Sequence, residues 1–373
     1  MRILHVNPFF FPYAGGIERR ILGLAKELQR ADHDMHVLTG QLPGTRTAEV
    51  FEGISVTRLP SKTYNVYNPP YIRSFGVEDA IRRLRPDVID FHYRWAPTYT
   101  RALKAVAGEV PVVFTFHNTF AEGSGFWGAV SWLNDTRFKG FLRRCRTVVC
   151  VSEFVRDQLL AAGVPADKTR VVYNGVDPTS DDELARLRRQ ASASDPPYCV
   201  FVGRVVRIKG VDVLIDAAAQ MESPVRFKVV GKGPALDDLK KRAARKGVAS
   251  RFDFMGYIDE ARKRELIAGA AAMTHPARFE ASAVILYEAL DLGCPVIATR
   301  TGGNAEIVGE AGEFVALDDP HALASAIDRL MANKARRDAM AAAARERSSL
   351  FAWRAIAEQM EEVYEHAAAP RAR

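Results

Sequence analysis

The chain has 373 residues, which is too long for one ordinary hydrophobic core and suits two domains of about 150 to 200 residues each. Its composition, 48% hydrophobic and 26% charged, is that of a globular protein, and no apolar run approaches the roughly 18 residues that a membrane-spanning helix needs. The net charge of +7 belongs to the first half, because residues 1–175 hold 23 Lys and Arg against 16 Asp and Glu, whereas residues 176–373 hold 29 of each.

The amino-terminal segment, MRILHVNPFFFPY, predicts a strand over 2–7 followed by a loop. Pro8 and Pro12 interrupt its apolar stretch and no small-residue cleavage site follows, so we do not expect a signal peptide. The protein is therefore expected in the cytoplasm, either free or peripheral at the inner face of the membrane. The four cysteines lack metal-ligand spacing, and we expect buried free thiols.

A glycine pair, Gly15-Gly16, stands between the first strand and a helix expected from about 17 to 30. Glycine lets the backbone approach a ligand closely, and N–H groups at a helix start can hold a diphosphate. A plain strand-to-helix turn is the alternative explanation. The aromatic residues before the pair suggest either a wall for an acceptor or lipid, or burial against the same domain: Phe9, Phe10, Phe11 and Tyr13.

The rest of the first half alternates between strands and helices, which predicts a parallel sheet. Strands are expected at 35–39, 54–59, 87–91, 111–116, 147–151 and 169–173, and helices at 79–84, 97–107 and 152–162. His117 directly follows the strand VVFTF, at the sheet edge where open α/β sheets bind ligands, so we predict that it contacts the ligand. His92 ends the preceding strand and could line the acceptor side. A structural role is the alternative for both.

The densest basic segment, RFKGFLRRCR over 137–146, interleaves apolar residues with five basic ones, as in a helix with one apolar and one cationic face. Such a helix can simply pack on its own domain. Attraction to anionic lipid headgroups or to an anionic acceptor is the second interpretation. Nucleic acid is not expected as a partner, because no recognisable module for it occurs in the sequence.

A polar, proline-ended segment over 178–197 predicts a linker with one short helix, between domains at 1–177 and 198–350. The strand and helix pattern then restarts. Strands are expected at 198–202, 226–230, 252–257, 271–274 and 294–299, and helices at 211–221, 259–268, 284–292, 320–333 and 334–347. A final helix from 351 to 369 has an apolar stripe that predicts packing: Trp353, Ile356, Met360 and Val363.

Two cations follow the first strand of the second half, in GRVVRIKG. Arg204 and Lys209 lie five residues apart in a loop that begins with Gly203, and such a pair suits a diphosphate on a departing nucleotide. Two surface cations are the alternative. The later GKGP turn does not complete a dinucleotide-binding fingerprint, because Leu236 stands where the third glycine would be.

Two acids flank the apolar run over 284–292. Eight residues along one helix would leave Glu280 and Glu288 on adjacent rather than coincident faces, so we place Glu280 in the loop before the helix. There it lies at the helix N-terminus, where N–H groups and the dipole favour anions such as phosphate, while Glu288 can point into the same cleft. By itself the pair could equally be two solvated acids.

Seven motifs occur in order along nearly the whole chain: GGIER, HN, NGVD, GRVVRIKG, VGKGP, PARFEASAVILYEALDLGCPVIA and GGNAE. This series resembles the retaining nucleotide-sugar glycosyltransferases of family 4. The resemblance implies an α/β protein of GT-B architecture, with two Rossmann-like domains facing across a cleft. The N-terminal domain, 1–177 with the final helix 351–369, would bind the acceptor, and the C-terminal domain, 198–350, the nucleotide sugar.

The resemblance also implies roles for single residues. Glu288 accepts hydrogen bonds from the ribose hydroxyls, and Glu280 and His117 contact the transferring sugar. Arg204, Lys209 and the Gly16 amide stabilise the leaving nucleotide. The implied catalytic residues are His117, Glu280, Arg204 and Lys209, and the binding residues are Gly15, Gly16, Arg204, Lys209, Glu280, Ala283, Val284 and Glu288. Neither a cofactor nor a metal is implied, because the nucleotide sugar is a substrate, and the acceptor is a sugar or a lipid-linked hydroxyl.

Two departures from the family pattern bear on these roles. Tyr173 stands where a proline is usual, and Ala281-Ser282-Ala283 replaces a glycine-containing run after Glu280, adding methyl groups where the donor approaches. A nucleotide-sugar 2-epimerase of similar architecture is one alternative, although the GRVVRIKG clamp argues against it. The other is a non-catalytic GT-B protein that binds a membrane or a partner through its basic first domain.

Overall fold

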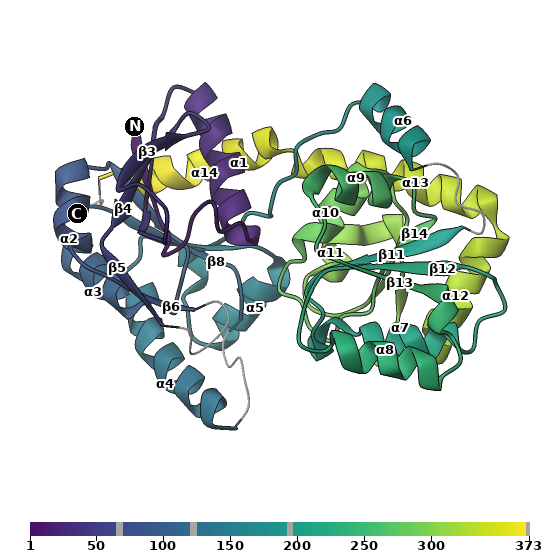
Figure 1. The fold of residues 1–373 in the computed structure, drawn as a ribbon. Coiled ribbons are helices and arrows are strands. Elements are labelled where there is room, and N and C mark those ends of the chain that lie inside the picture. Colours follow the sequence, from purple (N-terminus) through teal and green to yellow (C-terminus); the bar gives the residue numbers. More distant parts are fainter. Residues whose placement is uncertain (65–69, 120–124, 192–196, 371–373) are drawn as a thin grey trace. The chain divides into compact units, whose positions relative to one another are not determined.

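The computed structural model describes residues 1–64, 70–119, 125–191 and 197–370, and the side chains of 125–130 and 132 are left aside. The chain divides into two compact units (Figure 1). The first unit contains Met1–Gly175 and Trp353–Arg373, and the second contains Val176–Ala352. Each unit is built around its own mostly parallel sheet.

The first unit has an eight-stranded sheet in the order β10-β9-β8-β7-β1-β2-β4-β3, parallel except for β3 at one edge. Its strands are β1 (Arg2–Val6), β2 (Asp34–Gly40), β3 (Ala48–Phe51), β4 (Ile54–Leu59), β7 (Val88–Phe91), β8 (Val112–Phe116), β9 (Thr147–Cys150) and β10 (Thr169–Val171). A separate antiparallel sheet pairs β5 (Ser61–Tyr64) with β6 (Tyr71–Ser74). The central strands are buried along their length, as expected for a sheet covered on both faces.

The helices of the first unit are α1 (Gly16–Arg30), α2 (Val77–Leu84), α3 (Pro97–Val106), α4 (Gly125–Leu142), α5 (Glu153–Ala161) and α14 (Trp353–Ala368). Although α14 comes last in the chain, it packs beside α1, as Figure 1 shows in yellow and purple. Its apolar stripe enters the core, where Ile356 and Met360 are fully buried. Gly23 of α1 makes room for it, because a Cβ there would lie 2.3 Å from the Trp353 ring.

The second unit has a six-stranded parallel sheet in the order β13-β12-β11-β14-β15-β16. Its strands are β11 (Tyr198–Val202), β12 (Arg226–Val230), β13 (Phe252–Gly256), β14 (Ala272–His275), β15 (Val296–Thr299) and β16 (Gly312–Val315). Its helices are α6 (Asp181–Gln190), α7 (Val211–Ala218), α8 (Leu236–Arg245), α9 (Glu260–Ala268), α10 (Val284–Asp291), α11 (Asn304–Val308), α12 (Pro320–Ala332) and α13 (Lys334–Ser348). Figure 1 shows α7 and α8 on one face of this sheet and α9 and α10 on the other.

The segment 178–197, expected as a linker, contains a packed helix. Helix α6 starts at a Ser180 cap, packs against α9 and buries Leu184 and Leu187, because its apolar residues share one face. It belongs to the second unit. Residues 192–196 of the expected linker lie outside the described residues.

Two expectations from composition can be compared with the structure. All four cysteines are buried free thiols, which confirms the sequence-based expectation. Among the described helices, none combines the length and the apolarity that a membrane span requires.

Candidate functional site

The Glu280 carboxylate lies in the loop between β14 and α10, at one end of the second sheet. It follows β14, and its Oε1 is ion-paired with Lys209 Nζ and lies 3.1 Å from His275 Nε2. Burial alone would raise the pKa of Glu280, but the hydrogen bond from His275 and the charge of Lys209 outweigh it and lower the pKa to about 2. Glu280 is therefore an ionised and weakly basic carboxylate.

The lowered pKa of Glu280 makes a prediction about stability and pH. Because the folded-state pKa lies below the ordinary 4.5, the charge of Glu280 stabilises the fold above about pH 4.5, and this contribution is lost as the pH falls toward 2. We expect the difference in unfolding free energy between the wild type and Glu280→Gln to shrink by about 2 kcal/mol between about pH 6 and pH 3. Urea unfolding at each pH measures it. Glu310→Gln, at an exposed acid, is the control, and an equal change in both variants would contradict the assignment.

Two glycines bring the neighbouring loops against the Glu280 segment. Gly302 has φ +53°, and a Cβ on it would lie 1.5 Å from the Glu280 carbonyl oxygen. Gly210, at φ +72°, would place its Cβ 1.8 Å from the Pro276 carbonyl oxygen. A glycine is needed at both points, because an L side chain would be strained and would overlap the backbone. GRVVRIKG and GGNAE thus share one wall with the acidic segment.

The two predicted diphosphate-binding cations differ in their surroundings. Arg204 is exposed, and no hydrogen bond or ion pair of its side chain occurs within the described residues. Lys209 is already paired with Glu280, so its charge is shared between that carboxylate and any incoming phosphate. The GKGP turn has a packing role: a Cβ on Gly231 or Gly233 would overlap the backbone of Gly203 or Val205.

Glu288 lies on α10 and is ion-paired with Lys263 of α9. Lys263 is 9% exposed and also lies 2.7 Å from Glu260, so the cation connects two acids. A carboxylate has several lone pairs, so Glu288 can accept further hydrogen bonds besides its ion pair. The sequence analysis did not identify Lys263. The only sign of it in the sequence is that this lysine lies on the face of α9 that is otherwise apolar.

The first turn of α10 has backbone amides that lack partners within the helix. It begins at Val284 after the N-cap Ala283, whose side chain makes no capping hydrogen bond. The methyl groups that replace the family's glycines are directed inward, since Ala281 and Ala283 are only 8% and 5% exposed. The departure at 281–283 therefore adds little surface where a donor could approach.

In the first unit, the glycine pair is organised by a buried acid. Glu18 of α1 accepts a hydrogen bond from the Gly15 amide at 2.8 Å and from Asn7 Nδ2 at 2.9 Å. Burial raises the pKa of Glu18 to about 7 against the opposing hydrogen bonds. In this structure the Gly15 amide donates to Glu18, and binding of a diphosphate at Gly15 stays a prediction. Gly16 begins α1, where first-turn amides lack helical partners.

The arginine that directly follows GGIER, Arg20, has a structural role. Arg20 is 1% exposed and donates to the Tyr173 carbonyl at 2.5 Å and to Asn174 Oδ1 at 3.1 Å. It therefore fixes the start of the NGVD turn, where tyrosine replaces the usual proline.

His117 directly follows β8, as predicted, and is half-buried. Its Nε2 lies 3.2 Å from Nδ1 of His92. His92, expected on the acceptor side, is 2% exposed and lies between His117 and His5 of β1. Together with His117 it lines a small hollow of about 10 Å³. Sequence analysis missed His5 and Asp90, although both are polar residues inside apolar strands, a pattern that marks buried partners.

The aromatic loop and the basic segment mostly pack on their own unit. Phe9 and Phe10 are buried, and Tyr13 is 37% exposed. In the basic segment, three apolar residues are buried and three arginines are exposed: Phe138, Phe141 and Leu142, and Arg137, Arg143 and Arg144. The segment therefore packs by its apolar face and keeps cations in solvent.

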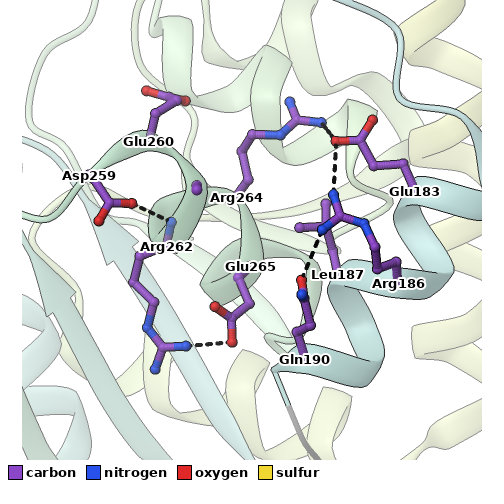
Figure 2. Close-up of a pocket in the computed structure, with 10 residues that line it drawn as sticks. Glu183, Arg186, Leu187, Gln190, Asp259, Glu260, Arg262, Arg264 and Glu265 are labelled. Atoms are coloured by element: carbon purple, nitrogen blue, oxygen red, sulfur yellow. Dashed lines mark hydrogen bonds and ion pairs between the residues drawn. The ribbon is translucent and has the colours of Figure 1, made fainter.

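A hollow of about 820 Å³ lies between α6 and α9 (Figure 2). Figure 2 shows Arg264 and Arg186 approaching Glu183, while Arg262 approaches Glu265. Among the described residues that line it, none is a predicted site residue. Since its charges largely pair with one another, we do not assign this hollow to the site.

Comparison with known proteins adds the family. Residues 14–180 match the model of Glycosyltransferase Family 4, and residues 184–347 match that of Glycosyl transferases group 1. The D-inositol 3-phosphate glycosyltransferase of Xylanimonas cellulosilytica is 28% identical, over 98% of this chain and 96% of the relative. The phosphatidyl-myo-inositol mannosyltransferase of Mycolicibacterium smegmatis is also 28% identical, over 98% and 94%. These relatives give no support to the epimerase alternative.

Solved structures have the same fold. Sucrose-phosphate synthase from Thermosynechococcus elongatus superimposes with a TM-score of 0.80 at 22% identity, covering 98% of both chains. Anabaena Alr3699/HepE in complex with UDP and glucose gives a TM-score of 0.78 at 22% identity, covering 98% of this chain and 99% of that one. Both family models match in the predicted order, and together they take in most of the sequence. The chain therefore belongs to the group 1 glycosyltransferases of family 4 and is a nucleotide-sugar glycosyltransferase with the GT-B fold.

Proposed function

We propose that the chain transfers a hexosyl group, with retention of configuration, from a nucleoside diphosphate sugar to an acceptor hydroxyl. The observation that carries this proposal is the Glu280 carboxylate, held by Lys209 and His275 close to the start of α10. A cation and a row of helix amides suit a diphosphate, and a fixed carboxylate suits the hydroxyls of a sugar. These three features belong to one group of loops in the second unit.

Each predicted residue then has a role in this proposal. Arg204 and Lys209 neutralise the charge that builds on the departing diphosphate, together with the amides that begin at Ala283 and Val284. Glu288 accepts hydrogen bonds from the ribose. From the first unit, the Gly16 amide contributes to binding the diphosphate, and His117 contacts the sugar. Gly15 contributes indirectly, through the carboxyl group that holds its amide.

The electrostatics of Glu280 favour a reaction without a covalent enzyme intermediate. A carboxylate whose pKa is lowered to about 2, and which is paired with a lysine and a histidine, is a weak base and a poor nucleophile. The bond from the anomeric carbon to the phosphate oxygen breaks, the acceptor oxygen bonds to that carbon, and the acceptor proton leaves with the nucleotide phosphate. We propose no metal for this step, since side-chain cations and helix amides supply the positive charge.

The acceptor is proposed to be a sugar or a lipid-linked hydroxyl. Relatives act, by name, on D-inositol 3-phosphate and on phosphatidyl-myo-inositol, and a structural neighbour binds UDP and glucose. The exposed arginines Arg137, Arg143 and Arg144 support contact with an anionic membrane surface or an anionic acceptor. With such contact, the protein would work at the inner face of the cytoplasmic membrane.

Nucleotide release from a panel of UDP-, GDP- and ADP-sugars tests the proposal. We expect one nucleotide to be released in the presence of a chelator, and Glu288→Ala to lower its release about 10- to 100-fold through lost charge-assisted hydrogen bonds. Glu310→Ala is the matched control, because Glu310 is an exposed acid beyond the end of α11 and has no proposed role. Stimulation by a lipid extract would support a membrane-borne acceptor.

Three results would count against the proposal. Loss of release with chelator would contradict metal independence, and equal activity of Glu288→Ala and Glu310→Ala would remove Glu288 from the site. No release from any sugar, together with no shift in thermal unfolding on adding nucleotides, would favour the non-catalytic alternative.

A further inference from the structure

Three histidines form a row from the core of the first unit to the end of β8. Nδ1 of His5 lies 2.9 Å from Nε2 of His92, and Nδ1 of His92 lies 3.2 Å from Nε2 of His117. His5 and His92 are 0% and 2% exposed, whereas His117 is half-buried. The row therefore starts at a sealed ring and ends at one that solvent or a ligand can reach.

All three rings are neutral near neutral pH. Burial lowers the pKa of His5 to about 3, and it lowers the pKa values of His92 and His117 well below the ordinary 6.5, with Arg20 adding to the effect in each case. A neutral imidazole offers one N–H donor and one acceptor nitrogen. His92 must then donate at one of its two contacts and accept at the other, so the row can run in only two directions.

The buried end of the row selects between these directions. His5 Nε2 is buried, and within the described residues it has no hydrogen-bond partner. If the row ran from His117 toward His5, this nitrogen would carry an N–H without an acceptor. If the row runs from His5 toward His117, Nε2 is left only with an unused lone pair. Buried N–H groups without partners are the rarer case in proteins, so the second direction is favoured.

Asp90 holds the first link of the row in place. Its Oδ2 accepts a hydrogen bond from the Tyr364 hydroxyl of α14 at 2.6 Å, and Thr115 donates to the same carboxylate. Oδ2 lies 3.9 Å from His5 Nδ1 and 3.6 Å from His92 Nε2. It stabilises the proton shared by these nitrogens in either direction, so the unused nitrogen of His5 remains the deciding feature.

We propose that His5 and His92 are positioning residues that fix His117 as the tautomer with its proton on Nδ1, so that His117 presents an N–H donor to the substrate. The role of that donor rests on the proposed function, in which His117 contacts the transferring sugar. The tautomer itself is a property of the first unit and can be measured without any activity.

Nitrogen NMR of the full chain labelled with ¹⁵N-histidine tests the proposal, with the His117 ring assigned by its loss in His117→Asn. We expect Nδ1 of His117 to be protonated and Nε2 to be bare. His5→Leu removes the first donor and should move the proton of His117 toward Nε2. His5→Asn places an amide where Nδ1 was, so it should restore the wild-type pattern, and the exposed His321→Asn should leave it unchanged.

Activity provides a second readout. His5→Leu is expected to lower kcat about 10-fold with little change in the donor KM, because a donor that acts in the transition state is lost, and His5→Asn is expected to recover most of it. If His5→Leu does not fold, the wild-type and His5→Asn spectra still test the proposal, because both should show the proton of His117 on Nδ1. An inactive wild type with a proton on Nδ1 would overturn the proposed function and leave this inference intact.

Other outcomes would overturn the inference. A wild-type His117 protonated on Nε2, or on both nitrogens, would show that the row does not run this way. An unchanged His117 in folded His5→Leu would show that His5 does not act on it. The ligand atoms of His5, Asp90 and His92 lie within 4.8 Å of one another. A metal retained stoichiometrically by the purified chain after dialysis against a chelator would therefore assign these residues to an ion instead.

Discussion

Replacing Lys209 by methionine is expected to lower kcat for sugar transfer by about 10²- to 10³-fold, the usual effect of losing one electrostatic donor to a transition state. Methionine keeps most of the length and apolar volume of the lysine stem. The variant loses the cation beside Glu280. The Glu280 side chain is 12% exposed, and of its two partners described above, Lys209 and His275, only His275 would remain. The pKa of Glu280 should therefore rise in the variant, because burial is no longer outweighed as strongly.

Arg207→Met is the matched control for this variant. Arg207 lies in the same loop and is exposed, so its replacement should change kcat by no more than about twofold. A Lys209→Met enzyme that keeps more than about a tenth of the wild-type kcat would contradict the role of Lys209.

A double-mutant cycle separates the two ways in which Lys209 can act. If the lysine acts only by holding Glu280, then Lys209→Met combined with Glu280→Gln should be no less active than Glu280→Gln alone. If Lys209 also contacts the diphosphate, the double variant should lose a further large factor in kcat. The proposed function requires the second result.

Gly302→Ala should destabilise the fold by about 3 kcal/mol or more and lower activity about 100-fold. Two costs combine: the left-handed backbone at φ +53° is strained by a Cβ, and that Cβ would lie 1.5 Å from the Glu280 carbonyl oxygen. The Glu280 segment must move to relieve the overlap, which shifts the carboxylate away from Lys209. Urea unfolding and kcat measure the two effects.

Gly247→Ala isolates the first of these costs. Gly247 is exposed, has φ +72°, and an added Cβ there would meet no atom within 4 Å. It should therefore cost only about 1 kcal/mol and leave kcat unchanged. Equal effects of the two substitutions on stability would mean that the contact with Glu280 is not tight.

The sequence predicted the fold well because the relevant signals are local. Short apolar runs ending in glycines or histidines mark parallel strands and their ligand-binding ends, which placed His117 and the loop containing Glu280 correctly. The short helix expected within 178–197 is present as α6, but its packing against the second unit was not foreseen, because α6 buries a narrow apolar stripe within a polar sequence. A two-residue stripe is a weak periodic signal.

Partners within the site could not be predicted in the same way, because they depend on tertiary placement. Lys263 and Glu288 lie on different helices, so their ion pair cannot be predicted from their spacing in the sequence. Glu18 lies in the motif GGIER, yet its side chain accepts a hydrogen bond from the Gly15 amide only because the helix starts at that point. His5 and Asp90 are adjacent in register across β1 and β7, so the two strands had to be paired before the histidine row could be recognised.

The position of α14 has a consequence for biosynthesis. The last residues of the chain complete the core of the first unit, where Trp353 packs over Gly23 and Tyr364 reaches Asp90. A ribosome releases the whole of the second unit, Val176–Ala352, before that helix emerges. The unit that is synthesised first is therefore expected to finish folding last, in contrast to the usual order in which amino-terminal domains fold first during translation.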